Sequence, residues 1–377
     1  MIDWTKYRSL FPHIDQYTYL NHASISPINL RAKTAIQDFL ELRHGKNIEF
    51  WPDAMDRKLH FLKLIAQLIN ADADNIALVP STSGGLNILS LGLNWQKGDR
   101  IILNDFEFPA NVIPFTNLRR HGVEIDFVHH DHGKIHLEDI IEKIQSSTRV
   151  LSISFVEFMN GFRNEMEELG KICREQDVIF CVDAIQGAGA LKIDVKKWQV
   201  DFLSTGGHKW LMWPAGLGFI YISPRIFDRI YPAQAGWISL DVPYDFFNYQ
   251  QPFAANARRF EPGGFNTMAI MGAIPNIEMM LEIGPQALEE KILGNTKYIM
   301  NELTQRDIEL FSDSTAQHLS GIVTFNHARA EALFEYLKKN RIFVSLREGK
   351  IRVSPHFYNN TEDLNILIKA IDNFNRQ

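Results

Sequence analysis

Seven short apolar runs, several of them separated by segments with helical periodicity, constrain the fold of this 377-residue chain more than any other feature. Such alternation is typical of an α/β fold with a largely parallel sheet. The runs cover Ile76–Val79, Arg100–Leu103, Val123–Val128, Val150–Phe155, Val178–Val182, Phe202–Leu203 and Gly218–Ile222. We therefore expect one broad, mainly parallel seven-stranded sheet.

The chain is long enough for about two domains of ~100–200 residues each. Helical periodicity runs from Asn29 to about His44 and from about Asp53 to Asn70, and the pattern changes after about Phe253. The elements expected beyond that point are helices at Met268–Leu281, Gln286–Arg306, Ala328–Asn340 and from Thr361, and strands at Gly321–Phe325, Phe343–Leu346 and Lys350–Ser354. This order suits a smaller α+β domain. We predict a large domain over residues 15–260 and a small domain over residues 261–377, joined by the N-terminal segment 1–14.

Charge and composition exclude several classes of protein. Lys and Arg number 39 against 45 Asp and Glu, a net charge of −6, which argues against a dedicated nucleic-acid binder. The segment Met1–Arg8 has no apolar core of a signal peptide, and no window approaches ~18 uncharged apolar residues, so we expect neither secretion nor a membrane helix. Two cysteines form no disulfide framework. A cytoplasmic location is the simplest interpretation.

A histidine-rich segment, His129–His136, resembles a metal-binding cluster at first sight. Its spacing matches no established ligand pattern, and Asp131-His132-Gly133 is a turn signal. We therefore predict a solvated loop between a strand and a helix, and no metal site.

Three polar segments follow apolar runs, where ligands bind in open α/β sheets. Asp183 ends one run and serves either as a turn or helix-cap residue or as a ligand contact. Lys209, in Ser204–Trp210, is either a solvated surface cation or a desolvated nucleophile, and the Gly-Gly-His frame before it favours the second. Pro80–Asn87 either caps a helix with Ser81 or Thr82 or binds an anion.

A reactive lysine, a carboxylate at a strand end and an anion site together match the needs of pyridoxal phosphate. This cofactor forms a Schiff base with a lysine, pairs its ring nitrogen with a carboxylate and requires a phosphate site. We therefore predict pyridoxal 5'-phosphate as the cofactor.

The chain resembles the class V aminotransferase family of fold-type-I enzymes, which includes cysteine desulfurases, kynureninase and isopenicillin epimerase-like enzymes. The resemblance runs from Tyr19–Ala23 to Arg352–Tyr358. It implies that Lys209 forms the Schiff base, that Asp183 pairs with the ring nitrogen and that Gln186 approaches the phenolic oxygen. It further implies that His208 and the turn Thr82-Ser83-Gly84 hold the phosphate, that Phe108 covers the ring and that Arg352 grips the substrate carboxylate. His22 is expected on the substrate side, and Trp237 either lines that side or is a packing residue. Gly264 has no hydroxyl and offers only a backbone contact to the phosphate of a partner subunit.

Departures from the desulfurase pattern bear on the reaction. The stretch Ser345–Lys350 lacks the nucleophilic cysteine of desulfurases. Cys173 and Cys181 fall on a predicted helix and a predicted buried strand, so neither suits a mobile sulfur carrier. The segment Val156–Gly161 lacks the asparagine that contacts the ring oxygen in desulfurases, and either Glu157 or Asn160 replaces it.

The predicted activity is therefore that of a class V aminotransferase acting on an amino acid. The alternatives are a β-lyase or desulfurase-like C–S lyase without the desulfurase cysteine, and a non-catalytic regulatory protein, against which Lys209, Asp183 and Arg352 argue. The family implies a homodimer with its active site at the interface, and the aromatic stretch Tyr244–Phe253 is either core or interface. Arg347 either recognises a second acidic group or is a solvated loop residue.

Overall fold

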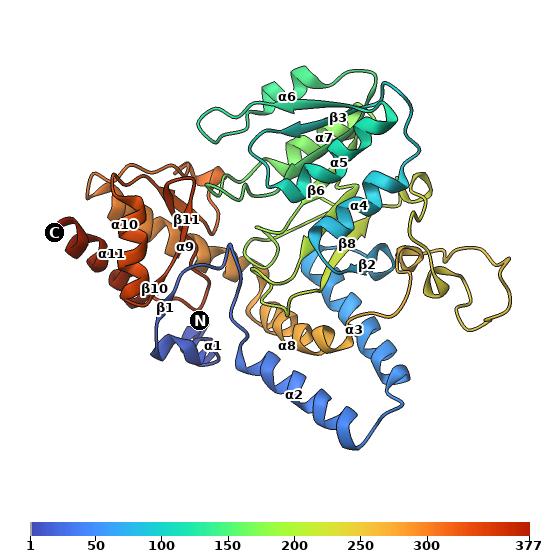
Figure 1. The fold of residues 1–377 in the computed structure, drawn as a ribbon, viewed down its shortest axis with the longest axis horizontal. Helices are drawn as coiled ribbons and strands as arrows, with labels where there is room; N and C mark the ends of the chain where they lie inside the picture. Colours follow the sequence, from blue (N-terminus) through green and yellow to red (C-terminus); the bar gives the residue numbers. More distant parts are fainter. Residues whose placement is uncertain (1) are drawn as a thin grey trace.

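A computed structural model describes residues 2–377, and a seven-stranded sheet lies at its centre (Figure 1). The strand order is β2-β8-β7-β6-β5-β3-β4. The strands are β2 (Ile76–Val79), β3 (Arg100–Asn104), β4 (Glu124–Val128), β5 (Thr148–Ser154), β6 (Ile179–Asp183), β7 (Phe202–Gly206) and β8 (Gly218–Ile222). Only β8 runs against its neighbours, β2 and β7, within this sheet. The predicted mainly parallel sheet of seven strands is confirmed.

One strand differs from its prediction in a way that matters for the site. β7 continues beyond Phe202–Leu203 through Ser204, Thr205 and Gly206, all of which are buried. The Ser204 hydroxyl donates to the backbone oxygen of Thr82 at 2.9 Å, so a polar side chain is accommodated inside the sheet. An apolar run alone could not reveal this extension.

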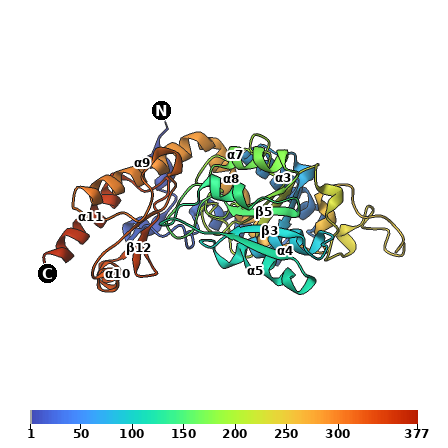
Figure 2. The ribbon, with the colours of Figure 1, turned by 90° about the horizontal axis from the view of Figure 1, so that it is seen from above.

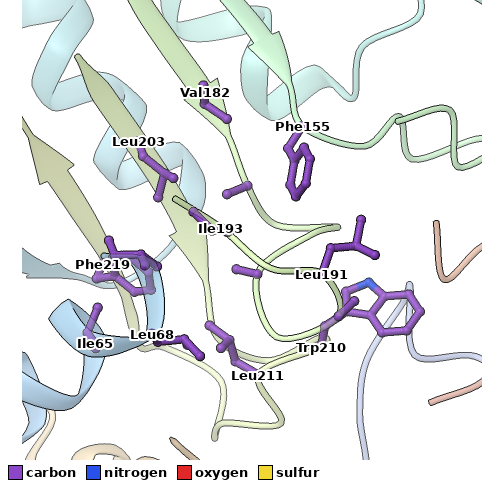
Figure 3. Packing of buried hydrophobic residues seen from close by; sticks show 14 of the residues in the cluster. Ile65, Leu68, Phe155, Val182, Leu191, Ile193, Leu203, Trp210, Leu211 and Phe219 are labelled. Atoms are coloured by element: carbon purple, nitrogen blue, oxygen red, sulfur yellow. The ribbon is translucent and has the colours of Figure 1, made fainter. Parts of the chain in front are cut away.

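Helices cover the sheet and build the larger core. They are α1 (Trp4–Arg8), α2 (Leu30–Gly45), α3 (Trp51–Ile69), α4 (Thr82–Gly92), α5 (Ile113–Thr116), α6 (Leu137–Lys143), α7 (Met166–Glu175) and α8 (Thr267–Ile283). In Figure 3, Ile65 and Leu68 of α3 lie beside Phe219 of β8, and Trp210 and Leu211 belong to the same cluster of buried side chains. No helix in residues 2–377 combines the length and the apolar character that crossing a membrane requires.

The C-terminal part forms a second, smaller α+β core, as predicted. Its elements are β9 (Val323–Phe325), β10 (Ile342–Phe343), β11 (Ser345–Arg347), β12 (Lys350–Val353), α9 (Pro285–Thr304), α10 (Ala330–Lys339) and α11 (Thr361–Asn375). An antiparallel sheet has the order β11-β12-β9. Figure 2 shows α9 running from the region of the large sheet toward this part, and its buried residues contribute to both cores.

The division into domains at residues 14/15 and 260/261 stays a prediction, and packing crosses it at several places, two of which are pairings of whole elements. The short strand β1 (Thr18–Tyr19) pairs in parallel with β10 of the C-terminal part. The helix α8 packs against α2 and α3, and its buried side chains belong to the larger core. The N-terminal segment therefore pairs with a strand of the C-terminal part before the chain enters the large sheet.

A buried ion pair ties α3 to the turn that precedes α8. Lys58 and Glu261 form it, with side-chain exposures of 3% and 6%. The other carboxylate oxygen of Glu261 accepts a hydrogen bond from the backbone N–H of Leu78 at 2.9 Å. Three segments that are distant in the sequence therefore meet at one carboxylate.

Glu261→Ala should lower the free energy of unfolding by about 3–5 kcal/mol, because it leaves the Lys58 ammonium buried without a counter-charge. The double variant Lys58→Met/Glu261→Leu should recover most of this loss. Urea unfolding followed by tryptophan fluorescence measures both. The exposed pair Lys196–Asp72 provides the control, and Asp72→Ala should leave the unfolding midpoint nearly unchanged. Equal effects of the two alanine variants would contradict this account.

Candidate active site

Lys209 lies in a loop that follows β7 and is held close to the sheet by Gly207. The backbone N–H of Gly207 donates to Leu217 O at 2.9 Å, and Trp213 N–H donates to Gly207 O at 2.9 Å. A Cβ atom at residue 207 would lie 2.1 Å from the Trp213 ring, so only glycine fits there. The glycine before the lysine is thus a packing requirement that fixes the course of the loop.

The Lys209 amine loses its proton more readily than a surface lysine because its pKa is lowered. Burial lowers its pKa to about 8, against the opposing effect of Asp183. The positive charges of Arg352 and Arg347 also lower this pKa. A larger fraction of the free amine, the nucleophilic form, is therefore present near neutral pH than for a surface lysine.

Asp183 is the last residue of β6, and its carboxylate is buried at the same edge of the sheet. Burial raises its pKa to about 6, while the N–H of Ile185 and the charge of Lys209 act in the other direction. Oδ1 accepts the Ile185 N–H at 2.9 Å. Within residues 2–377, Oδ2 has no hydrogen-bond partner although it is buried. Oδ1 of Asp183 therefore stabilises the turn, and Oδ2 is available to a ligand.

The N-terminus of α4 lies beside the lysine loop. Ser81 caps the helix by accepting the Gly84 N–H at 3.1 Å. Thr82 Oγ1 is buried and has no partner among the described residues. The Cβ position of Gly206 is 3.4 Å from Thr82 Oγ1 and 3.3 Å from His208 Nδ1, so these two side chains flank the same glycine. Backbone N–H groups, a free hydroxyl and an imidazole thus meet at a helix N-terminus, where anions bind.

Packing of α4 on the sheet depends on a second glycine. A Cβ atom at Gly85 would lie 2.2 Å from Ser204 Oγ and 2.5 Å from Ile220 Cγ2. The helix therefore approaches β7 and β8 closely, which places its N-terminus at the sheet edge that carries Lys209.

Phe108 offers an aromatic face to this region. Its side chain is 44% exposed, and its ring centroid is 5.7 Å from Lys209 Nζ. The ring packs edge-on against Phe158 with centroids 5.2 Å apart. An exposed ring held in this way is suited to stacking on a flat ligand.

Two further buried acids, Glu107 and Glu157, lie behind Asp183. Glu107 accepts both the N–H and the hydroxyl of Ser154 at 2.6 Å, and Ser154 is the register partner of Asp183. Burial, opposed by the Ser154 hydrogen bonds and reinforced by Asp183, raises the pKa of Glu107 to about 7. The sequence analysis assigned no role to Glu107, although it directly precedes Phe108 in the segment that the resemblance singled out.

Glu157 and Asn160 differ in whether their side chains keep an atom without a hydrogen-bond partner. Asn160 donates to Gly133 O at 2.8 Å and accepts the Phe162 N–H at 3.0 Å, so both ends of its amide are engaged. Glu157 Oε1 accepts from Asn104 at 3.2 Å and from Asn164 at 3.0 Å, while Oε2 is unpartnered among residues 2–377. Burial, then Glu107, raises the pKa of Glu157 well above its usual value. Its surroundings therefore favour the protonated form of the Glu157 carboxyl.

Arg352 reaches the site from β12 of the small sheet. Nη1 donates to Phe158 O at 2.5 Å, and Nη2 donates to Ser24 Oγ at 2.9 Å. The buried Nε has no partner within the described chain. Burial and the neighbouring Arg347 lower the pKa of this guanidinium to about 9.

Four other predicted site residues either contact protein groups or lie exposed. Gln186 donates to Ala23 O at 3.1 Å and accepts from Trp210 Nε1 at 2.9 Å, so its amide already connects protein segments. His22 is fully buried between Ser354 O and the Tyr358 hydroxyl, a structural position. Trp237 packs with Trp51 and Tyr244 in an exposed aromatic group, and Gly264 lies exposed with open space around its Cβ position. Their predicted roles stay predictions.

Both cysteines lie where the sequence predicted, in α7 and in β6, and both are buried. Burial raises the pKa of each thiol. In the histidine-rich segment, His129 Nδ1 contacts Asp105 Oδ2 at 2.7 Å, and residues 2–377 contain no group of three or more His, Cys, Asp or Glu side chains arranged to bind a metal ion.

Comparison with known proteins agrees with the resemblance seen in the motifs. The family model described as aminotransferase class-V matches residues 19–367. A probable cysteine desulfurase of Pyrococcus abyssi is 30% identical over 335 residues, which cover 82% of this chain and 81% of the relative. The uncharacterized aminotransferase YcbU of Bacillus subtilis is 26% identical over 368 residues, covering 97% and 96% of the two chains.

Solved structures share the fold along nearly the whole chain. The apo cysteine desulfurase of Thermococcus onnurineus NA1 has a TM-score of 0.90 and 25% identity, covering 99% of this chain and 98% of that one. A variant of the enzyme C-DES, solved with glycine linked covalently to its pyridoxal phosphate cofactor, has a TM-score of 0.89 and 22% identity, covering 99% and 100%. The predicted fold type is confirmed.

Glu157→Gln should make the protein more stable than the wild type as the pH rises above about 5. The pKa of this carboxyl in the folded chain lies above its usual 4.5. Below that value both folded and unfolded chains are protonated; above it the unfolded chain loses the proton first, so stability falls as pH rises. The amide cannot ionise and should remove this fall, gaining about 1.4 kcal/mol for each unit of the pKa shift.

Urea unfolding from about pH 5 to about pH 8 measures this difference. The exposed Glu335, replaced by Gln, provides the control and should follow the wild-type curve. If Glu157→Gln also follows the wild-type curve, the Glu157 carboxyl is not protonated in the folded chain.

Proposed function

This chain belongs to the aminotransferase class-V family, and we propose that it is an aminotransferase acting at the α-carbon of an amino acid through Lys209. It is a pyridoxal phosphate-dependent enzyme. The observation that supports the assignment of roles most directly is the juxtaposition of a lysine of lowered pKa with a buried carboxylate that has one unpartnered oxygen.

The residues present fit this cofactor. Asp183 Oδ2 and Thr82 Oγ1 are buried without partners in the described chain, and such groups are costly unless a ligand satisfies them. A protonated ring nitrogen suits the first atom, and a phosphate oxygen suits the second. When bound, pyridoxal phosphate supplies an electron-withdrawing ring that stabilises negative charge at the substrate α-carbon.

Each residue of the site has a defined task in this proposal. Asp183 accepts a hydrogen bond from the ring nitrogen. Thr82, Ser83 and Gly84, at the start of α4, donate to the phosphate together with His208. Phe108 covers one face of the ring, and Gln186, which uses one Nε2 hydrogen for Ala23, keeps the other for the phenolic oxygen.

Lys209 and Arg352 act on the substrate. The unprotonated amine of Lys209 would hold the cofactor covalently, and Nζ, once released by the substrate amine, would take the α-proton. Arg352 has a free Nε and further Nη hydrogens for the substrate α-carboxylate. Burial raises the pKa values of Glu107 and Glu157 and so favours their protonated forms beside Asp183.

A C–S lyase is the alternative, because relatives and structural neighbours include cysteine desulfurases and a cystine C-S lyase. Both thiols of this chain are buried, so neither is available to carry sulfur from a substrate. A lyase of this chain would release its sulfur product without a protein persulfide. Product analysis distinguishes the two reactions, since transamination yields a keto acid matching the substrate and the pyridoxamine form of the cofactor.

We further propose a cytoplasmic homodimer with the aromatic arm, residues 231–253, in its interface. In Figures 1 and 2 the segment between β8 and α8 projects from the body of the molecule. It exposes a group of apolar rings: Tyr231, Trp237, Tyr244, Phe246, Phe247 and Tyr249. Contiguous apolar surface of this kind is typical of a protein–protein contact. Gly264, exposed near this region's end, would then offer its backbone to the partner's phosphate.

Lys209→Ala should abolish the visible absorbance band that the wild-type protein shows with added pyridoxal phosphate. Turnover with pooled amino acids should fall by at least about 10²–10⁴-fold, since the base that takes the α-proton is lost. The control is Lys192→Ala, at an exposed lysine, which should keep both the absorbance band and the turnover of the wild type. An unchanged band in Lys209→Ala would overturn the assignment of the lysine.

Replacing Phe247 and Tyr249 together by Ser should weaken self-association. Their side chains are 87% and 79% exposed in the single chain, so the substitutions remove interface area without disturbing the core. The dimer dissociation constant should rise by about ten-fold or more, as measured by sedimentation velocity at several concentrations. An identical association state would place the interface elsewhere.

A further inference from the structure

Two arginine side chains converge on one serine beside Lys209. Arg352 Nη2 donates to Ser24 Oγ at 2.9 Å, and Arg347 Nη2 approaches the same oxygen at 3.5 Å. Ser24 is held in turn by Ser345, whose hydroxyl is 3.0 Å away. The proposed aminotransferase function uses only one of these guanidinium groups, for the α-carboxylate.

The hairpin β11–β12 fixes the two arginines relative to each other. Ser345 lies directly opposite Arg352 in the register, so both side chains are on one face, and Arg347 is two residues further along that same face. The strands are joined by Glu348 and Gly349, with φ of 44° and 71°, a tight two-residue turn. The spacing of the two guanidinium groups is therefore built into a rigid hairpin rather than into a loose loop.

The positive charges of Arg347 and Arg352 have no ion-pair partner among residues 2–377. Arg352 is 2% exposed, its Nε lacks a partner, and its two hydrogen bonds in the described chain go to a carbonyl and a hydroxyl. The only side-chain hydrogen bond of Arg347 within residues 2–377 is the one to Ser24. Both arginines also act on Lys209, so three cationic groups share one region. Arg352 is a buried cation, which requires an anion, whereas Arg347 is exposed at the end of β11, where a ligand can reach it.

One α-carboxylate supplies a single negative charge and pairs with one guanidinium. We propose that Arg347 binds a second anionic group on the substrate side chain, so that the substrate is an amino acid with an acidic side chain. This inference rests on the proposed function and makes Arg347 the residue that determines specificity. Arginine suits this task because its planar fork donates two parallel hydrogen bonds to a carboxylate or sulfinate.

The test compares isosteric substrate pairs, glutamate with glutamine and aspartate with asparagine, in the wild type, Arg347→Gln and Arg347→Lys. Wild-type kcat/KM should favour the acidic member of a pair by at least about ten-fold. Arg347→Gln should lower kcat/KM for the acidic member by about 10–100-fold and leave the amide member within about three-fold. Arg347→Lys should recover part of the loss. Arg341→Gln, at an exposed arginine, should match the wild type.

Binding without turnover provides a second readout. Calorimetry should show glutarate binding to the wild-type holoenzyme more tightly than butyrate, and Arg347→Gln should remove this difference. A uniform loss for acidic and neutral ligands in Arg347→Gln would mean that both arginines hold the α-carboxylate, which overturns the inference. No effect of Arg347→Gln would also overturn it, leaving a solvated arginine. Reaction of the wild type with no amino acid at all would instead contradict the proposed function.

Discussion

The carboxylate of Asp183, buried at the end of β6 with one oxygen unpaired, is the constraint on which the rest of the site depends. A buried charge is stable only when neighbours and a ligand compensate for lost water. The Ile185 N–H and Lys209 favour the ionised form of Asp183, and in return Asp183 limits how far burial lowers the pKa of Lys209. The pKa values of Glu107 and Glu157 are raised by burial, which favours their protonated forms next to this charge. One negative charge is therefore kept where a cationic ring is needed.

The N-terminal segment connects the residues around Asp183 to Arg352, the proposed substrate-binding residue. β1 pairs with β10 of the C-terminal part, and the Ser24 hydroxyl then accepts a hydrogen bond from Arg352 of β12. Two residues later, Ser26 N–H donates to His208 O at 2.9 Å, directly before Lys209. Gln186, which follows Asp183 by one turn, binds Ala23 O. Residues 23–26 thus contact the small sheet, the lysine loop and the end of β6. A displacement of Arg352 would therefore shift the loop that carries Lys209.

The sequence predicted those parts whose cause is local. All seven apolar runs became strands of one sheet, because strands buried on both faces need near-continuous apolar side chains. Asp183 and Lys209 were found because they follow such runs. The antiparallel direction of β8 and the pairing of β1 with β10 depend on contacts between distant segments and left no local signal. The same holds for Glu107, whose burial arises only when β5 and β6 lie side by side, and for His22, which the structure engages in packing rather than leaving free.

The central claim, that Asp183 holds a cationic ring nitrogen, is tested most directly by nitrogen-15 NMR of the protein reconstituted with ring-labelled pyridoxal phosphate. The account predicts a protonated ring nitrogen in the wild type and a shift toward the unprotonated form in Asp183→Asn. Glu157→Gln, which changes no charge in this account, should leave the resonance in place. An unprotonated nitrogen in the wild type, or the same resonance in Asp183→Asn as in the wild type, would contradict it.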